Sequence, residues 1–293
     1  MKIPFLMIFT SLYLVASTAF ISSSDLKDKL QNKTLVLLDV TDELTYKAGH
    51  IPNAVGVNVG DFRHQVEAYQ LMNDSKSIET LAQSLGINND SDIVIYGHGQ
   101  EKELLKSSYI ALALIVNGAN NVSILDGGYA DWLFENKQLS STKTPTIKKG
   151  NFTAKFNPNI LVDLKYVNDS IGKVPMLESR PAKFYYGEEQ SQGVRRLGHI
   201  PKAMTSFWKD KFNSDDTVLN QKKLKSIYLA EHKLDPNKEV IIYCTGGLEA
   251  SMNWYIAYKE LGFTNVKLYD ASMKEWGNRD DTPMEITPTP ANK

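Results

Sequence analysis

The sequence predicts an α/β protein made of two similar domains, each a mostly parallel sheet flanked by helices on both faces. Short runs of Val, Ile and Leu alternate with longer stretches of helical periodicity, a pattern typical of a parallel sheet covered by helices. The chain of 293 residues also carries one series of motifs twice. Residues 140–150, a polar stretch rich in Ser, Thr and Lys, lie between the two copies and are typical of a linker.

The internal repeat consists of four pairs of segments that keep the same order. They are an apolar run with an acid near its end, a Gly-His-Ile-Pro turn, a Val/Ile run that ends in Tyr, and a closing segment that ends in Trp. The pairs are 35–40 and 174–180, 46–52 and 195–201, 93–96 and 240–243, and 125–132 and 268–276. This repetition indicates two homologous domains. We place them at 25–139 and 151–280, followed by a flexible tail at 281–293.

Residues 1–19 have the features of a secretory signal peptide. Lys2 precedes an apolar run at 3–14, and the small residues at 17–19 are of the kind that a signal peptidase reads. The run is shorter than the roughly 20 residues of a membrane-spanning helix, although an uncleaved anchor is the alternative. We expect cleavage after Ala19, export to the periplasm, and no stable membrane association afterwards.

Composition and charge exclude several classes of function. The formal net charge is −1, so a nucleic-acid partner held by bulk positive charge is not expected. The five histidines show no metal-ligand spacing, and there is only one cysteine. No glycine-rich dinucleotide fingerprint follows a strand. We therefore expect no metal and no organic cofactor, while a small anionic substrate is compatible with one local positive site.

The single cysteine, Cys244, is the strongest candidate for a catalytic nucleophile. Exported proteins usually pair their cysteines, and a lone one cannot form an internal disulfide. The alternative is that it is a small buried hydrophobe. Aligning the two halves on Tyr96 and Tyr243 places Gly97 opposite Cys244, so only the second half has a thiol at this position.

The segment after Cys244 predicts a short loop that leads from a strand into a helix. Apolar residues recur at helical spacing through Trp254 and Leu261, and Gly262 suits the C-terminal cap. Backbone N–H groups converge in such a loop, and the helix adds the positive end of its dipole. We expect both to lower the pKa of the thiol. The residues expected to direct N–H groups into the loop are Thr245, Gly246, Gly247, Leu248 and Glu249.

Other polar residues of the repeat have weaker cases for a catalytic role. His50 and His199 share the Gly-His-Ile-Pro turn, and one of them lies in the half without a thiol. We therefore interpret both as structural, each holding a turn by a side-chain hydrogen bond. His98 lies in the first half's counterpart of the loop, and we assign it no role. Arg195 and Arg196 either add positive potential near the second turn or are simply solvated.

These motifs resemble those of tandem-domain rhodaneses, the thiosulfate/3-mercaptopyruvate sulfurtransferase family. The resemblance spans residues 25–277 and rests on the repeated turn, the Leu-Asp-Gly-Gly-x-x-x-Trp segment with its partner ending at 275–277, and Tyr-Cys-x-x-Gly at 243–247. It implies that the Cys244 thiolate takes sulfur from a small anionic donor and releases sulfite or pyruvate. A thiophilic acceptor, cyanide or a thiol, then collects the sulfur from the persulfide. It also implies that Arg180 binds the donor, where the alternative is a salt bridge between domains.

The resemblance leaves the donor open. The loop has neither the basic residues of thiosulfate-preferring members nor the Gly-Ser-Gly of mercaptopyruvate-preferring ones, so thiosulfate is our first choice and 3-mercaptopyruvate our second. Glu249 either faces the pocket, where it would repel an anion, or points outward and complements the helix dipole. A related phosphatase of the Cys-x5-Arg type is not expected, because Ala250 stands at the arginine position. The second class of function is a non-enzymatic persulfide carrier or redox sensor.

Overall fold

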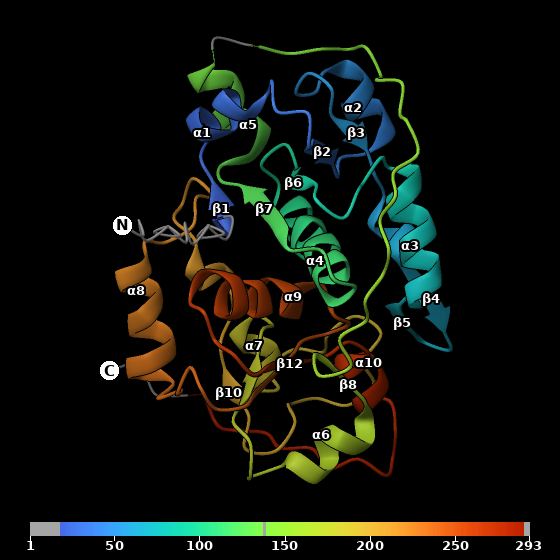
Figure 1. The fold of residues 1–293 in the computed structure, drawn as a ribbon. Helices are drawn as coiled ribbons and strands as arrows, with labels where there is room; N and C mark the ends of the chain where they lie inside the picture. Colours follow the sequence, from blue (N-terminus) through green and yellow to red (C-terminus); the bar gives the residue numbers. More distant parts are fainter. Residues whose placement is uncertain (1–17, 137–138, 290–293) are drawn as a thin grey trace, which may run out of the picture.

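The computed structural model describes residues 18–136 and 139–289, which form two domains of the same design (Figure 1). Each domain is built on a five-stranded sheet whose paired strands are all parallel. Read from one edge, the strand orders are β3-β2-β6-β7-β1 and β10-β9-β11-β12-β8, which correspond position by position. The predicted α/β class and the duplication are therefore confirmed.

The central strands of both sheets are the apolar runs that the sequence indicated. The first sheet contains β1 (Phe20–Ile21), β2 (Leu35–Asp39), β3 (Val55–Gly56), β6 (Asp92–Tyr96) and β7 (Asn121–Leu125). The second contains β8 (Leu161–Val162), β9 (Met176–Glu178), β10 (Met204–Thr205), β11 (Val240–Tyr243) and β12 (Val266–Tyr269). A separate antiparallel hairpin in the first domain pairs β4 (Arg63–Val66) with β5 (Tyr69–Met72).

Helices connect the strands, and several begin at a side chain that caps their first N–H groups. The Asp74 carboxylate accepts the Ser77 N–H at the start of α3, and that of Asp163 accepts the Tyr166 N–H at the start of α6. The first domain contains α1 (Ser23–Lys29), α2 (Glu43–Ala48), the 3₁₀ turn η1 (Val59–Phe62), α3 (Ser75–Ser84), α4 (Glu101–Val116) and α5 (Gly128–Glu135). The second contains α6 (Leu164–Ser170), α7 (Ala182–Tyr185), the 3₁₀ turn η2 (Trp208–Lys211), α8 (Gln221–Lys225), α9 (Leu248–Tyr255) and α10 (Ser272–Trp276), with π-helical turns η3 (Ser226–Glu231) and η4 (Ile256–Glu260) continuing α8 and α9.

Both faces of each sheet are covered, because successive residues of the strands enter different cores. In β6, Ile93 and Ile95 belong to one large cluster shared by the two domains, whereas Val94 and Tyr96 belong to a cluster on the outer face of the first sheet. In β11, Ile242 joins the shared cluster, while its neighbours on either side join an outer cluster of the second domain. This alternation explains why the strands are apolar throughout.

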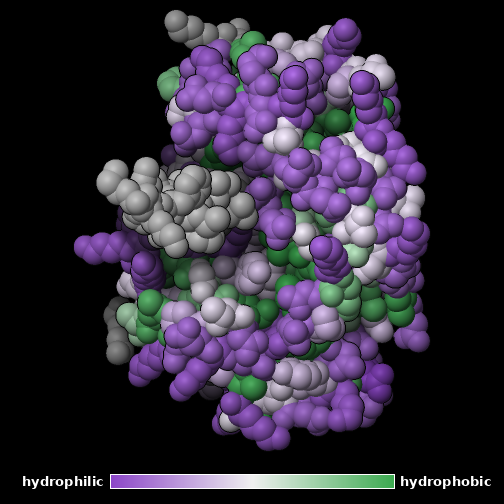
Figure 2. Space-filling view, in the orientation of Figure 1, coloured by the Kyte–Doolittle hydropathy of each residue, from purple (hydrophilic) through white to green (hydrophobic). Residues whose placement is uncertain are grey.

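The domains meet through α4 and α9, which lie side by side at the centre of the molecule (Figure 1). The hydroxyls of Ser108 and Ser251 are 2.7 Å apart where the helices meet. The face shown in Figure 2 is mostly hydrophilic, and hydrophobic residues show there only in small areas. Most residues of α4 and α9 are buried, as expected for two helices that pack on each other at the centre of the molecule.

The structure modifies the expected segment boundaries. The first sheet includes β1, so this domain begins before Asp25. In the tail, Glu285 exchanges two backbone hydrogen bonds with His199, and Thr282 is buried, so these residues pack on the second domain instead of forming a flexible end. The expected leader at 1–17 and the last residues at 290–293 lie outside the described residues. No helix within the described residues is long and apolar enough to span a membrane.

Candidate active site

Cys244 lies at the carboxyl end of β11, where the chain turns into α9. The side chain is fully buried. The Gly247 N–H donates to its sulfur at 3.1 Å, and the Cys244 N–H donates to the Ser272 hydroxyl at 3.0 Å. Gly247 has φ +93°, and a Cβ there would lie 2.2 Å from Asp270 Oδ1. The predicted loop is therefore present, and glycine is required for its closing turn.

The expected low pKa of the thiol is wrong for this closed loop. Burial raises the pKa of Cys244 to about 12, and the negative charge of Glu249 acts in the same direction. The N–H groups of Ala250, Gly246 and Gly247 lower the pKa, but by less. The sequence pattern revealed the donors of the loop, whereas the pKa is dominated by the loss of water around the sulfur.

Glu249 faces the loop instead of pointing outward. Its carboxylate accepts the Thr245 N–H at 3.4 Å, and hydrogen bonding to Cys244 helps to stabilise its charged form. Burial nevertheless raises the pKa of the Glu249 carboxyl, while the positive charge of Arg180 lowers it. A buried thiol and a partly exposed carboxyl, both of raised pKa, therefore lie next to each other in the loop. Leu248, the other loop residue predicted to contribute an N–H group, begins α9 and packs its side chain on the shared core.

Arg180 lies near the loop, but its guanidinium is used inside the second domain. The side chain is 1% exposed. Its Nε pairs with the carboxylate of Glu178, and Nη2 donates to the Gly198 carbonyl at 2.8 Å. This is an ion pair within one domain, joining the end of β9 to the turn before His199. Donor binding by Arg180 stays a prediction, and it would require competition with these partners.

A pocket of about 430 Å³ lies beside the loop on the side of the segment that follows α7. The pocket contacts the loop directly, because the hydroxyl of Ser191, which lines the pocket, is 3.0 Å from that of Thr245 in the loop. The stem of Lys274 packs on the same loop, since a Cβ at Gly246 would lie 3.3 Å from Lys274 Cδ. The pocket is lined by Gln190, Ser191, Gln192, Gly193, Val194, Arg195 and Asn278. Two cations therefore lie at this opening: Arg195, which the sequence analysis already named, and Lys274, which it did not.

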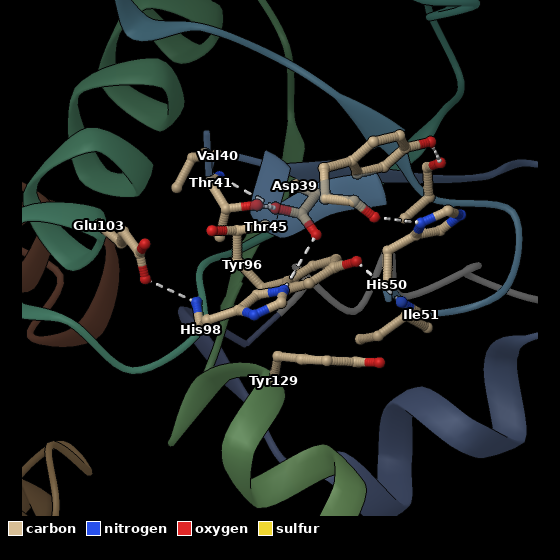
Figure 3. Close-up of polar contacts among 12 residues, drawn as sticks. Asp39, Val40, Thr41, Thr45, His50, Ile51, Tyr96, His98, Glu103 and Tyr129 are labelled. Carbon is tan, nitrogen blue, oxygen red and sulfur yellow. Dashed lines mark hydrogen bonds and ion pairs between the residues drawn. The ribbon is translucent and has the colours of Figure 1, made fainter. Parts of the chain in front are cut away.

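The first domain closes its corresponding loop with a carboxylate (Figure 3). Glu103 Oε2 accepts the N–H groups of His98 at 2.7 Å and Gln100 at 3.3 Å. A Cβ at Gly97 would lie 2.4 Å from Glu103 Cβ, so the position opposite the cysteine has no space for a side chain. The repeat places Glu103 opposite the small Ala250. At these two positions the first domain has Gly and Glu where the second has Cys and Ala, so only the second loop has space for a thiol.

His98 contacts a buried acid but does not face a thiol. Its Nε2 is 3.5 Å from Asp39 Oδ2, and its ring lies 4.2 Å from that of Tyr129 (Figure 3). A pocket of about 560 Å³ opens beside His98 and Tyr129. Burial opposes ionisation of the Asp39 carboxyl, but the contact with His98 and two hydrogen bonds from Thr41 hold its pKa below the usual value. The pair thus brings the first-domain loop into contact with the end of β2.

The structural interpretation of the two repeated histidines is confirmed by matching contacts. His50 Nδ1 is 2.9 Å from the Tyr46 carbonyl, and His199 Nδ1 is 2.8 Å from the Tyr185 carbonyl. Each ring also stacks on the tyrosine whose carbonyl it bonds. Of the arginines before the second turn, Arg196 donates to the backbone carbonyls of Trp276 and Thr282, and Arg195 pairs at the surface with Asp280.

Two contributors to the loop were not identified from the sequence. The first is Ser272, which accepts the Cys244 N–H. The sequence could have pointed to it, because the repeat places a glycine, Gly128, opposite this serine. Both residues have positive φ, +62° for Gly128 and +53° for Ser272, and serine is the unusual choice for this backbone. The second contributor is Arg63 of the first domain, whose Nη2 donates to the Gly246 carbonyl at 2.6 Å. It lies 183 residues away in sequence, and no motif points to it.

Comparisons with known proteins agree with the duplicated fold. The model of the rhodanese-like domain matches residues 22–135 and again 163–279. A protein of Synechococcus elongatus, named "Putative thiosulfate sulfurtransferase", is 29% identical over 285 residues, which cover 93% of this chain and 87% of that one. The "Sulfur carrier protein TtuD" of Thermus thermophilus is 26% identical over 288 residues, covering 90% and 95%. Among solved structures, the anaerobic ergothioneine biosynthesis enzyme of Chlorobium limicola has a TM-score of 0.79 at 20% identity, covering 93% of this chain and 71% of that one, and so shares the fold.

Proposed function

The chain belongs to the rhodanese-like family, with two copies of its domain, and we propose that it is a sulfurtransferase that carries the transferred sulfur on Cys244 as a persulfide. The observation that carries the proposal is the loop around the thiol. The Gly247 N–H already donates to the sulfur, and further N–H groups surround it. Such donors stabilise the negative charge that develops on a persulfide, as an oxyanion hole does in acyl transfer.

The first half-reaction begins with a proton transfer. Glu249 forms a hydrogen bond with Cys244, and burial raises the pKa of its carboxyl, which makes it a stronger base; we therefore assign Glu249 as the base that accepts the proton of Cys244. This transfer leaves one negative charge in the loop, on sulfur, and none on the carboxyl. The thiolate then attacks the outer sulfur of the donor. With thiosulfate, the donor's S–S bond breaks and its electron pair leaves with sulfite, so that Cys244 keeps the outer sulfur as a persulfide anion.

The second half-reaction returns the enzyme to its first state. A thiophilic acceptor such as cyanide attacks the outer sulfur of the persulfide, the S–S bond to Cys244 breaks, and the electron pair stays on the cysteine sulfur. Thiocyanate leaves, and the thiolate takes back the proton from Glu249. The two steps share one covalent intermediate, so the kinetics are expected to be of the ping-pong type.

We propose thiosulfate as the first choice of donor and 3-mercaptopyruvate as the second. Lys274, which packs on the loop, offers the positive charge that either anion needs, whereas the charge of Arg195 at the adjacent pocket is already paired with Asp280. Arg180 contributes its charge from below the loop, where it acts on Glu249. A comparison of turnover with the two donors at equal concentration decides between them.

A persulfide carrier is the second candidate function, and the name of the Thermus relative favours it. Full burial of Cys244 fits both candidates, because each must protect a persulfide from water and stray thiols. The two differ in the second half-reaction. An enzyme releases thiocyanate repeatedly when cyanide is supplied, whereas a carrier gains sulfur but does not turn over with small acceptors.

Sulfur loading of the purified protein tests the proposal. We expect the intact mass to increase by one sulfur atom after incubation with thiosulfate, and cyanide to reverse the increase while releasing thiocyanate. Cys244→Ser should show neither effect, and Ser251→Ala, a change of a buried hydroxyl at the domain contact, should retain both. Absence of the mass increase in the wild-type protein with either donor would refute the function.

We also propose export to the periplasm, supported by the apolar run at 3–14. The carbonyl of Thr18 accepts the Ser123 hydroxyl at 2.5 Å, and that of Ala19 accepts the Tyr255 hydroxyl at 2.5 Å. Cleavage after Ala19 would remove both acceptors, so a cleavage site before Thr18 is more compatible with the fold. N-terminal sequencing of the protein from a periplasmic extract checks this, and a mature chain starting at Phe20 would contradict it.

A further inference from the structure

The catalytic loop of the second domain is held from behind by a hairpin of the first. Strands β4 and β5 extend from the first domain to α10 of the second (Figure 1). The Met72 N–H donates to Asp270 Oδ2 at 2.7 Å, and the Tyr69 hydroxyl donates to the Glu275 carboxylate at 3.1 Å. Asp270 lies directly behind Gly247, as the clash expected for a Cβ at that glycine shows.

Arg63, the first residue of this hairpin, contacts the loop itself. Its side chain is 6% exposed, and its Nη2 donates to the Gly246 carbonyl at 2.6 Å. The same guanidinium lies 4.0 Å from Asp270 Oδ1 and 4.5 Å from the centre of the Tyr109 ring. A buried acid and an aromatic face thus fix the cation where it meets the loop.

The Gly246 carbonyl and the Gly247 N–H belong to one peptide unit. In a trans peptide these two groups point in opposite directions. Arg63 binds the carbonyl on one side of the unit, so the N–H on the other side is directed at the Cys244 sulfur, to which it donates at 3.1 Å. A glycine on each side leaves this unit free to rotate unless something holds it.

The contact between Arg63 and the Gly246 carbonyl does more than hold the two domains together, because the first-domain loop has no equivalent of it among the described residues. The Met72 N–H of the first domain donates to Asp270 of the second. In the same way, the Val218 N–H of the second domain donates to Asp126 of the first, at 2.8 Å. This shared contact docks each domain on the other. The counterpart of Arg63, however, is Phe212, which pairs with Val218 as Arg63 pairs with Met72. At this position an arginine therefore lies behind the loop that carries the thiol, and a phenylalanine occupies the matching position of the second domain.

We propose that Arg63 is a positioning residue of the sulfur-transfer site, one that orients the Gly246–Gly247 peptide so that its N–H stabilises the sulfur anion on Cys244. This inference rests on the proposed function, and it assigns the first domain a direct part in it. The domain without a nucleophile supplies the group that keeps the active loop in its anion-binding conformation.

Steady-state kinetics of Arg63→Met test the inference. Loss of one hydrogen-bond donor to a developing anion lowers kcat by about 10²–10³. In Arg63→Met the Gly247 N–H remains but is no longer held in place, so kcat should fall by about 10- to 100-fold, with little change in the KM for thiosulfate. Arg63→Lys, which keeps a donor to the carbonyl, should recover much of the loss. Arg279→Met, which removes an exposed arginine paired with Asp281, is the matched control and should behave as wild type.

Three outcomes would overturn the inference: a folded Arg63→Met variant with kcat within about twofold of wild type, a loss confined to KM, or no recovery with Arg63→Lys. If Arg63→Met does not fold, Arg63→Gln, which is polar but too short to keep the contact, takes its place with the same expected loss. Amide hydrogen exchange at Gly247 is independent of sulfur transfer. It should be faster in the variant, so the inference is tested even if the wild-type protein gains no sulfur.

Discussion

Replacing Glu249 by Gln separates the two effects that we assign to this carboxyl, the raised pKa of the thiol and acceptance of its proton. Two unit charges about 5 Å apart in an effective dielectric of about 20 interact by roughly 3 kcal/mol, which is about two pKa units. Glu249 retains partial exposure, so solvent reduces the effect, and we expect the pKa of Cys244 to fall by about one unit. The thiolate fraction at a fixed pH near 8 then rises about tenfold.

The assay measures two rates on the same protein. Alkylation of Cys244 by iodoacetamide, which needs only the thiolate, should be about tenfold faster in Glu249→Gln. Sulfur transfer should be slower by about 10²-fold or more, because a positioned base is lost. Glu103→Gln changes the carboxyl that closes the loop of the first domain and should alter neither rate. If alkylation and sulfur transfer change in the same direction, Glu249 is not the base.

Four further changes follow from the structure. Lys274→Met should raise the KM for thiosulfate several-fold and change kcat less, as measured by initial rates; an unchanged KM would place the donor elsewhere. Gly247→Ala should abolish most turnover and cost about 1–3 kcal/mol in urea unfolding, because its Cβ would overlap Asp270. Gly97→Ala should lower the free energy of unfolding by a similar amount alone, but by much less when Glu103 is also replaced by Ala. Additive losses in this double-mutant cycle would contradict the steric conflict between position 97 and Glu103. Burial raises the pKa of Asp126 to about 6, so the folded state loses stability as pH rises from about 4 to 6; Asp126→Asn should regain up to about 3 kcal/mol near pH 7.5 and nothing near pH 3, measured by urea unfolding at both pH values.

The sequence was sufficient for the fold because the signals that define it are local or repeated. The run Val240–Tyr243 is strand β11 with the predicted ends, and Ile93–Tyr96 is β6 less its first residue. The helix expected after Tyr243 is α9 with its π-helical continuation, and Gly262 follows with positive φ. The loop at Cys244 could be placed because a strand end and a glycine pair fix it in the chain.

The electrostatics of the site could not be predicted, because they depend on contacts between distant segments and on burial. The orientation of Glu249 is set by the closed loop, and a first-turn acid is equally compatible with an outward position. The role of Arg180 was taken from the resemblance to a family, and the sequence did not show that its guanidinium is bound by Glu178 and Gly198 in the folded domain. Arg63 reaches Gly246 from another domain, so no window of sequence contains both residues.

The two loops differ in the group that their N–H donors bind, and this difference explains why only the second domain has space for a thiol. A loop of converging N–H groups needs an acceptor. In the first domain the acceptor is the carboxylate of Glu103, a side chain of α4 that occupies the loop permanently. In the second it is the sulfur of Cys244, and the small Ala250 beneath it leaves space for the thiol. A cysteine introduced at position 97 would therefore not create a second active site, because its Cβ would lie 2.4 Å from that of Glu103 and the N–H groups would already be occupied.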